Sequence, residues 1–145
     1  MTYKELTDTI LAKLQSHPLI RTALFSSPLS WLNLNEQPEY PVGCFQVDTG
    51  NFSTGKIFNY SVQFWFLDKS GVDSEFETEV ISEQHLVGND IVSWLRRGDS
   101  DFLIDDVVTW TALSEKFEDY ISGVEFTVNL NVNANYGACD YPVND

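Results

Sequence analysis

Strict alternation of apolar and polar residues over positions 123–133 constrains the fold more than any other feature of this sequence. The segment reads GVEFTVNLNVN, and valine, phenylalanine or leucine occupies every second position from Val124 to Val132. Side chains of a β-strand point alternately to opposite faces of a sheet, so this period of two predicts a strand with one buried face. The opposite face carries Asn129, Asn131 and Asn133, and we expect it to meet solvent or a partner.

A β-hairpin is predicted upstream, in the segment VGCFQVDTGNFSTGKIFNYSVQFWFLD that begins at residue 42. Two alternating stretches flank a turn rich in Gly, Asn, Ser and Thr, expected at 49–55. Trp65 and Leu67 make the end of the second stretch apolar on both sides, which predicts that both faces are covered there. A short strand is predicted at 20–25.

The segment FLIDDVVTWTAL, residues 102–113, predicts one further strand before the last one. It is followed by SEKFEDYISG, residues 114–123, which we expect to form a loop or bulged turn. No internal repeat accompanies these strands.

Two helices are predicted, one before the hairpin in the sequence and one after it. Thr2 followed by Glu5 is a capping box, and the apolar spacing after it predicts a first helix that ends at His17-Pro18. The second helix is expected from about 74 to 97, with acidic residues near its positive end and arginines near its negative end. Gly88, inside that helix, predicts a kink or a close contact.

This order of elements predicts an α+β fold, with an antiparallel or mixed sheet of about five strands packed by two helices. The 145 residues contain 43% hydrophobic residues, enough for one core, and no linker-like stretch divides them. We therefore expect a single domain over 1–145, with a C-terminal tail at 134–145 whose polar composition predicts flexibility.

The charge balance excludes some partners. Asp and Glu number 22 and Lys and Arg 8, which gives a formal net charge of -14. Phosphate backbones would be repelled by such a surface, so specific recognition of nucleic acid is not expected. No apolar run approaches the roughly 20 residues that span a bilayer, so we expect no membrane contact. The acidic residues among the first 14 positions also argue against a signal peptide.

No motif for catalysis, metal binding or a cofactor is present. His17 and His85 stand on different elements without a partner at metal-ligand spacing, and no nucleophile motif or phosphate loop occurs. Four carboxylates follow the second predicted helix without the order of a calcium loop, and we expect them to be solvated: Asp99, Asp101, Asp105 and Asp106. The sequence therefore predicts a protein that is not an enzyme.

The tryptophans and cysteines are the remaining residues with a possible role in packing, in an interface or in a disulfide. Trp94 and Trp110 are expected in the core, whereas Trp31 and Trp65 are expected as anchors of an interface. The two cysteines, Cys44 and Cys139, are more simply explained as separate thiols than as a disulfide.

The layout as a whole resembles the small tail-terminator or tail-completion proteins of long-tailed bacteriophages. The resemblance rests on element order and on local stretches: the aromatic strand YSVQFWFLD, the long helix SEFETEVISEQHLVGNDIVSWL, the strand SGVEFTVNL and the following CDYP. It implies an α+β subunit that assembles into a ring, commonly a hexamer, without catalytic residues. Such a ring caps the tail tube and joins it to the head connector.

The resemblance also implies partners and a location. The partners would be the tail tube protein and the head-tail connector proteins, and the location would be the tail/neck junction of the virion after synthesis in the bacterial host cytoplasm. An acidic lumen would let DNA pass without specific binding. The expected interface residues are Trp31, Trp65, Asn129, Asn131, Asn133 and, in the tail, Tyr141.

Other readings stay open at this point. Tail-tube, stopper and other neck proteins share this pattern, and an enzyme of unrecognised type ranks last. The main alternative is a small acidic binding module that uses surface tryptophans, Trp31 and Trp65, to hold a protein or glycan partner. We expect the loops to dock to a partner: the hairpin tip at 49–55, the turn at 98–101 and, above all, the tail after Asn133.

Overall fold

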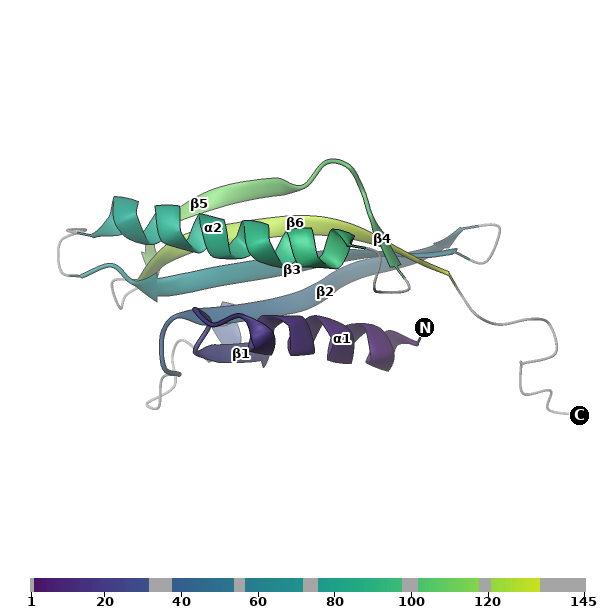
Figure 1. Ribbon diagram of the computed structural model, residues 1–145, viewed down its shortest axis with the longest axis horizontal. Helices are drawn as coiled ribbons and strands as arrows, with labels where there is room; N and C mark the ends of the chain where they lie inside the picture. The colour runs from purple at the N-terminus through teal and green to yellow at the C-terminus, as the bar shows by residue number, and fades with distance from the viewer. Residues whose placement is uncertain are drawn as a thin grey trace, which may run out of the picture.

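The computed structural model describes residues 2–31, 38–53, 57–71, 76–97, 102–117 and 121–133 of the chain. Two long helices accompany a sheet of long strands (Figure 1). In chain order the elements are α1 (Tyr3–Ser16), β1 (Thr22–Phe25), the 3-10 helix η1 (Pro28–Ser30), β2 (Val42–Ser53), β3 (Ile57–Lys69), α2 (Glu77–Arg96), β4 (Phe102–Ile104), β5 (Thr109–Phe117) and β6 (Ile121–Asn133).

One mixed sheet contains all six of these strands, in the order β1-β2-β3-β6-β4, with β5 also paired to β6. Only the β1-β2 pair is parallel. The sheet is centred on β3, which pairs with β2 along the hairpin and with β6 from Ile57 to Lys69. The expected α+β fold with two helices and a mixed sheet is therefore confirmed, with six strands rather than about five.

The expected single strand over 102–113 is wrong, because this segment forms two strands. β4 pairs with one end of β6 through Leu103 and Asn131, and β5 pairs further along β6, starting with Thr109 and Thr127. Between them, the Asp105 N–H still donates to the Asn129 carbonyl oxygen at 3.1 Å. Two further boundaries differ from expectation, since the strands extend through 49–53 and 114–117, which were predicted to lie in turns.

Helix α1 begins where the sequence predicts. The Thr2 hydroxyl accepts a hydrogen bond from the Glu5 N–H at 3.1 Å, and the Glu5 carboxylate accepts one from the Thr2 N–H at 3.0 Å. These reciprocal bonds satisfy two amide donors that would otherwise lack an intrahelical acceptor. The helix ends at Ser16, because His17 is extended.

The predicted close contact at Gly88 of α2 is confirmed. A Cβ atom built on Gly88 would lie 2.2 Å from the ring of Phe126 on β6, far inside van der Waals contact. The absence of a side chain therefore lets α2 approach the sheet closely. Intrinsic helix propensity disfavours glycine by about 1 kcal/mol relative to alanine, so packing decides the residue here.

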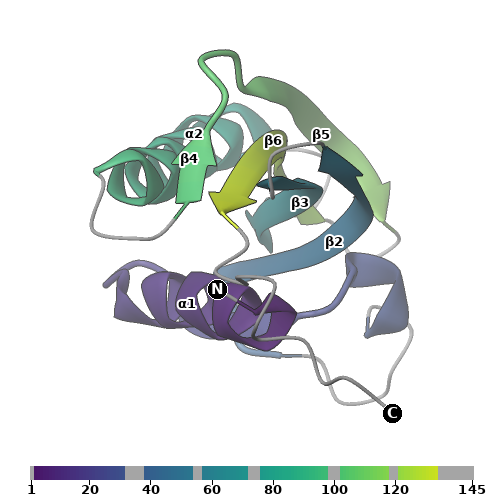
Figure 2. The same ribbon diagram turned by 90° about the vertical axis from the view of Figure 1, so that its right-hand side faces the viewer.

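Both helices cover the same face of the sheet, on the left in Figure 2. The predicted alternation in β6 is confirmed there, because the apolar residues from Val124 to Val132 are all buried. They join apolar side chains of α1, α2, β2 and β3 and of the segment before β1 in the main core: Leu6, Ile10, Leu14, Ile20, Phe45, Val62, Phe64, Phe66, Val87, Ile91, Val92, Leu95, Val124, Phe126, Val128, Leu130 and Val132. The opposite face, called the outer face below, is covered by neither α1 nor α2.

Candidate binding surface on the outer face of the sheet

The outer face changes character along its strands. Cross-strand partners on β2, β3 and β6 form rows across the face, because directly opposed residues point to the same side of a sheet. One end holds the rows Val42, Leu67 and Gly123, then Cys44, Trp65 and Glu125. Toward the other end come Gln46, Gln63 and Thr127, then Thr49, Ser61 and Asn129, then Asn51, Asn59 and Asn131. We call these two regions the apolar half and the polar half.

The apolar half is closed, and this corrects the expectation of surface tryptophans. Trp31 is only 6% exposed and Trp65 only 8%. They pack in a second hydrophobic core, whose buried residues are Trp31, Val42, Cys44, Trp65, Leu67, Leu113 and Ile121. Trp31 follows η1 directly and joins this core from outside the three central strands, and Leu113 and Ile121 come from β5 and β6. In this structure, Trp31 and Trp65 are therefore not presented on the surface.

The Cys44 thiol lies inside this second core. Its burial raises the pKa of Cys44 well above its ordinary value, and a smaller effect of the Trp31 indole acts in the opposite direction. Such a thiol stays protonated at neutral pH and is a poor nucleophile. Cys44 is a free cysteine, and Cys139 lies outside the described residues.

Trp110 also contradicts its expected place. It is 48% exposed at the edge of the sheet, and the centroid of its ring lies 4.4 Å from the ring centroid of His85 on α2. Trp94 does pack against the main core, as expected. The sequence thus indicated the wrong pair of tryptophans for the surface, because Trp65 and Trp110 both alternate within strands and local pattern does not separate them.

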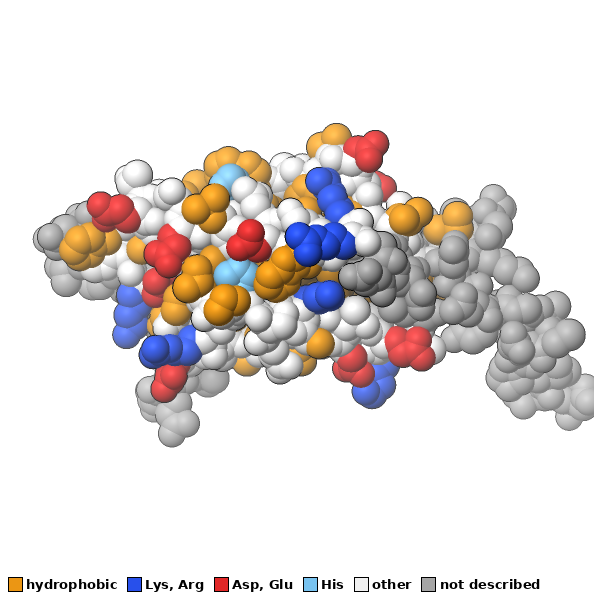
Figure 3. Space-filling model, viewed as in Figure 1, with side chains coloured by type: hydrophobic (Ala, Val, Ile, Leu, Met, Phe, Trp, Pro, Cys, Tyr) orange, Lys and Arg blue, Asp and Glu red, His pale blue; other side chains and the backbone are white. Residues whose placement is uncertain are grey.

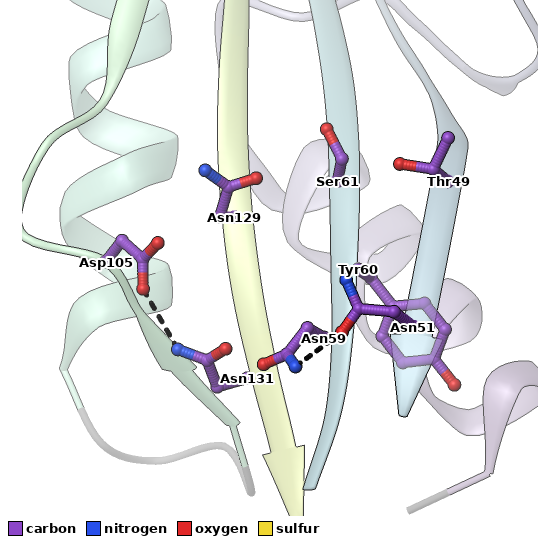
Figure 4. A pocket seen from close by; sticks show the side chains of 8 residues that line it. All are labelled: Thr49, Asn51, Asn59, Tyr60, Ser61, Asp105, Asn129 and Asn131. Atoms are coloured by element: carbon purple, nitrogen blue, oxygen red, sulfur yellow. Dashed lines mark hydrogen bonds between the residues drawn. The ribbon is translucent and has the colours of Figure 1, made fainter. Parts of the chain in front are cut away.

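The polar half contains a pocket of about 260 Å³. It lies over β2, β3 and β6 beside the segment that follows β4 (Figure 4), and its lining residues are Thr49, Asn51, Asn59, Tyr60, Ser61, Asp105, Asn129 and Asn131. The Asn59 amide donates to the Asn51 side-chain oxygen at 2.7 Å, and the Asn131 amide donates to the Asp105 carboxylate at 3.0 Å. No Lys, Arg or His side chain is among these lining residues.

Asp105 takes its position from helix α2. Two backbone carbonyl oxygens, those of Asp105 and Asp106, accept hydrogen bonds from the Arg96 guanidinium at 3.3 and 3.1 Å. Arg96 is the last residue of α2, so the end of the helix fixes the segment that brings Asp105 beside Asn131. Asp105 was expected to be only a solvated loop carboxylate, and Asp99 and Asp101 lie outside the described residues.

The structure brings together two of the asparagines that the sequence singled out. Asn129 and Asn131 line the pocket. Asn133 is the last residue of β6, and its side chain lies outside the described part of the structure. Tyr141 lies outside the described residues altogether. Asn59 and Asp105 were not predicted as site residues, and Asn51 was expected only as part of a docking loop at 49–55. The alternation in the second strand of the hairpin places Asn59 on its polar face, the same face that carries Asn131 on β6. No local pattern in the sequence points to Asp105.

The histidines are packed and do not form a site. His17 is buried, and its Nε2 lies 3.0 Å from the Asp90 carboxylate. The Leu19 N–H donates to His17 Nδ1 at 3.1 Å, so Nδ1 is an acceptor and Nε2 carries the proton that Asp90 accepts. Across the described residues, no group of three or more His, Cys, Asp or Glu side chains is arranged to hold a metal ion.

A scan against protein-family models and a search of curated proteins found no match to this chain. Within the described part of the chain, neither helix has the length and apolar character needed to cross a membrane.

Proposed function

We propose that this chain is a structural subunit of a phage tail or neck, a ring-forming tail-terminator or tail-completion protein that caps the tail tube and joins it to the head connector. The proposal starts from the resemblance in element order and local sequence described above. One structural observation supports it most: the two edges of the sheet are formed by different strands that lack a further partner among the described residues. β1 forms one edge, and β4 and β5 form the other.

Two unlike edges favour a head-to-tail contact between copies. An exposed edge strand offers unpaired N–H and C=O groups, and a second strand can extend the sheet there. When one edge of a subunit contacts the other edge of the next, the interface is heterologous, and it closes into a ring if the rotation between subunits allows. The described strands β1 and β5 would form this contact.

Exposed apolar side chains lie close to these edges. On the β4-β5 side, Leu103 is 72% exposed and Val107 is 76% exposed, and on the β1 side Phe25 is 43% exposed. Figure 3 shows apolar side chains along the upper border, where Figure 1 draws β5 and its connection to β4. Apolar side chains that remain in water in the monomer gain from burial in an interface.

The net charge of -14 agrees with this role. A ring of such subunits would carry a large acidic excess, and an acidic lumen would repel the DNA that passes through it. Lys and Arg side chains are interspersed with Asp and Glu on the face drawn in Figure 3, so this face is not uniformly acidic. The hexameric copy number, the tail tube and connector partners and the virion location come from the resemblance alone.

Light scattering and negative-stain electron microscopy of the purified protein, alone and with tail tube, test the proposal. We expect closed rings, alone or on the end of the tube, and a reduced ring population for Val107→Asp. Leu86→Asp is the matched control, because Leu86 is 61% exposed on helix α2 and belongs to neither sheet edge. A protein that stays monomeric under all these conditions would contradict the proposal.

Analysis of virions gives the second test. The protein should be detected in purified particles, and its loss should give tails of abnormal length or tails that fail to join heads, with normal capsids. Complete absence from virions would exclude the structural role.

A further inference from the structure

The pocket of the polar half has an arrangement of oxygen atoms that a simple polar surface does not require. Figure 4 shows the side-chain oxygens of Asn129 and Asn131 pointing from β6 toward β3, and the oxygen of Asn59 pointing from β3 back toward β6. The Ser61 hydroxyl lies on the same side of β3, opposite Asn129. Acceptors from two neighbouring strands therefore face one another across the pocket.

The orientation of Asn131 follows from its partner. A carboxylate at neutral pH only accepts hydrogen bonds, so the Asn131 nitrogen must face Asp105 and the Asn131 oxygen must face the pocket. Asn59 gives its own nitrogen to Asn51 at 2.7 Å, which leaves its oxygen facing Asn131. Two carbonyl oxygens opposed in this way cannot bond each other, so a donor group from a ligand can bridge them in place of solvent.

We propose that this pocket binds a guanidinium group, supplied by an arginine side chain of a partner protein. The guanidinium carries five N–H donors in a flat fork and no acceptor, which matches a set of acceptors spread over two adjacent strands. Asp105 supplies a negative charge beside the pocket, and the chain as a whole carries -14. The volume of about 260 Å³ is below that of typical small-molecule sites and fits one side chain.

A bare metal ion fits less well. Calcium takes six to eight oxygen ligands, carboxylates prominent among them, whereas Asp105 is the one carboxylate among the lining residues and already accepts a hydrogen bond from Asn131. The inference does not depend on the proposed function, since any protein partner with an accessible arginine would serve.

The alternative arrangement is a closed ladder. If the amides of Asn51 and Asn59 were both rotated by half a turn, Asn51 would donate to Asn59, Asn59 to Asn131 and Asn131 to Asp105. The opposed oxygens would then be satisfied within the chain, and the pocket would have no preference for a cation. The two arrangements therefore differ in ligand binding.

NMR titration of the isotope-labelled protein with N-acetyl-arginine amide distinguishes them, with the citrulline and lysine analogues as matched ligands. Citrulline keeps the shape of arginine without its charge. We expect saturable shifts of the Asn59, Asn129 and Asn131 side-chain amides with the arginine compound, at least threefold weaker binding of the lysine compound, and no saturation with citrulline. Equal binding of arginine and citrulline, or no saturation with arginine, would overturn the proposal.

Variants locate the binding. Asn129→Leu removes one oxygen that faces the pocket and should weaken arginine binding about threefold to tenfold. Thr127→Val is the control, because Thr127 occupies the same strand and face one row away and does not line the pocket. Both variants should retain the wild-type melting temperature to within a few degrees, since both positions are partly or fully exposed. Equal loss of binding in both variants would also overturn the assignment.

Discussion

The two halves of the outer face share the same three central strands and differ in what covers them. At the apolar half, Trp31 and Leu113 come from other segments and close over Trp65 on β3. At the polar half, the same strand continues with Ser61 and Asn59, and an open pocket remains. Alternation along a strand therefore identifies its two faces, whereas the burial of each face depends on side chains from segments distant in the sequence.

The largest expected effect comes from truncating Trp65. Trp65→Ala removes a large buried side chain from the second core and should lower the free energy of unfolding by about 3–5 kcal/mol. Asn59→Ala, three rows away on the same strand and face, should lower it by about 1 kcal/mol or less, because Asn59 is only partly buried. Urea unfolding followed by circular dichroism measures both, and equal losses would show that the two halves are not different in packing.

An intermediate effect is expected for Cys44→Ser. The serine hydroxyl would lie in an apolar site in place of a thiol that requires little hydrogen bonding, at a cost of about 1–3 kcal/mol. Thr49→Ser, on the polar half of the same strand, should change stability by about 0.5 kcal/mol or less.

The same thiol offers a chemical readout. In a Cys139→Ser background, Cys44 should react with a thiol reagent only as fast as the protein unfolds, because burial raises its pKa and blocks access. Rapid labelling of native protein would contradict a closed apolar half.

The smallest effect concerns Asp68, which follows Leu67 at the apolar end of β3. Partial burial raises the pKa of the Asp68 carboxyl, and the hydrogen bond from the Lys69 N–H, at 2.8 Å, opposes this shift. The folded state therefore binds the Asp68 proton more tightly than the unfolded state does, so this group costs stability as pH rises from the ordinary carboxyl pKa through the raised value.

Asp68→Asn mimics the protonated carboxyl at every pH. The variant should be more stable than the wild type at pH 7, by under about 1 kcal/mol because Asp68 is partly solvated, and the difference should vanish in acid. Thermal melts at pH 7 and pH 3 measure this difference. A variant that is less stable than the wild type at pH 7 would show that burial does not dominate at Asp68.

The parts of the fold that the sequence predicted are those with local causes. The cap at Thr2 depends on a residue three positions away, and the alternation from Val124 to Val132 depends only on the strand itself. Likewise, Gly88 stood out because its residue type is unfavourable inside a helix. In these cases the sequence near each residue contains the physical reason for the structure.

The candidate site depended on distant contacts and was predicted only in part. Asn129 and Asn131 were identified from alternation, but Asp105 reaches Asn131 across 26 positions and through a segment held by Arg96. Trp31 and Trp65 were misplaced for the same reason, since their cover comes from other strands. The split between β4 and β5 also has no local signal, because FLIDDVVTWTAL reads as one strand.

Cross-linking between the two edges of the sheet tests the proposed assembly most directly. In a background without native cysteines, Arg21→Cys beside β1 and Thr111→Cys on β5 would be combined in one chain and treated with a flexible bis-maleimide. Both positions are exposed. A head-to-tail ring predicts a ladder of covalent oligomers from the double variant and none from either single variant. A cross-linked dimer from a single variant, or no product from the double variant under conditions that preserve assembly, would contradict it.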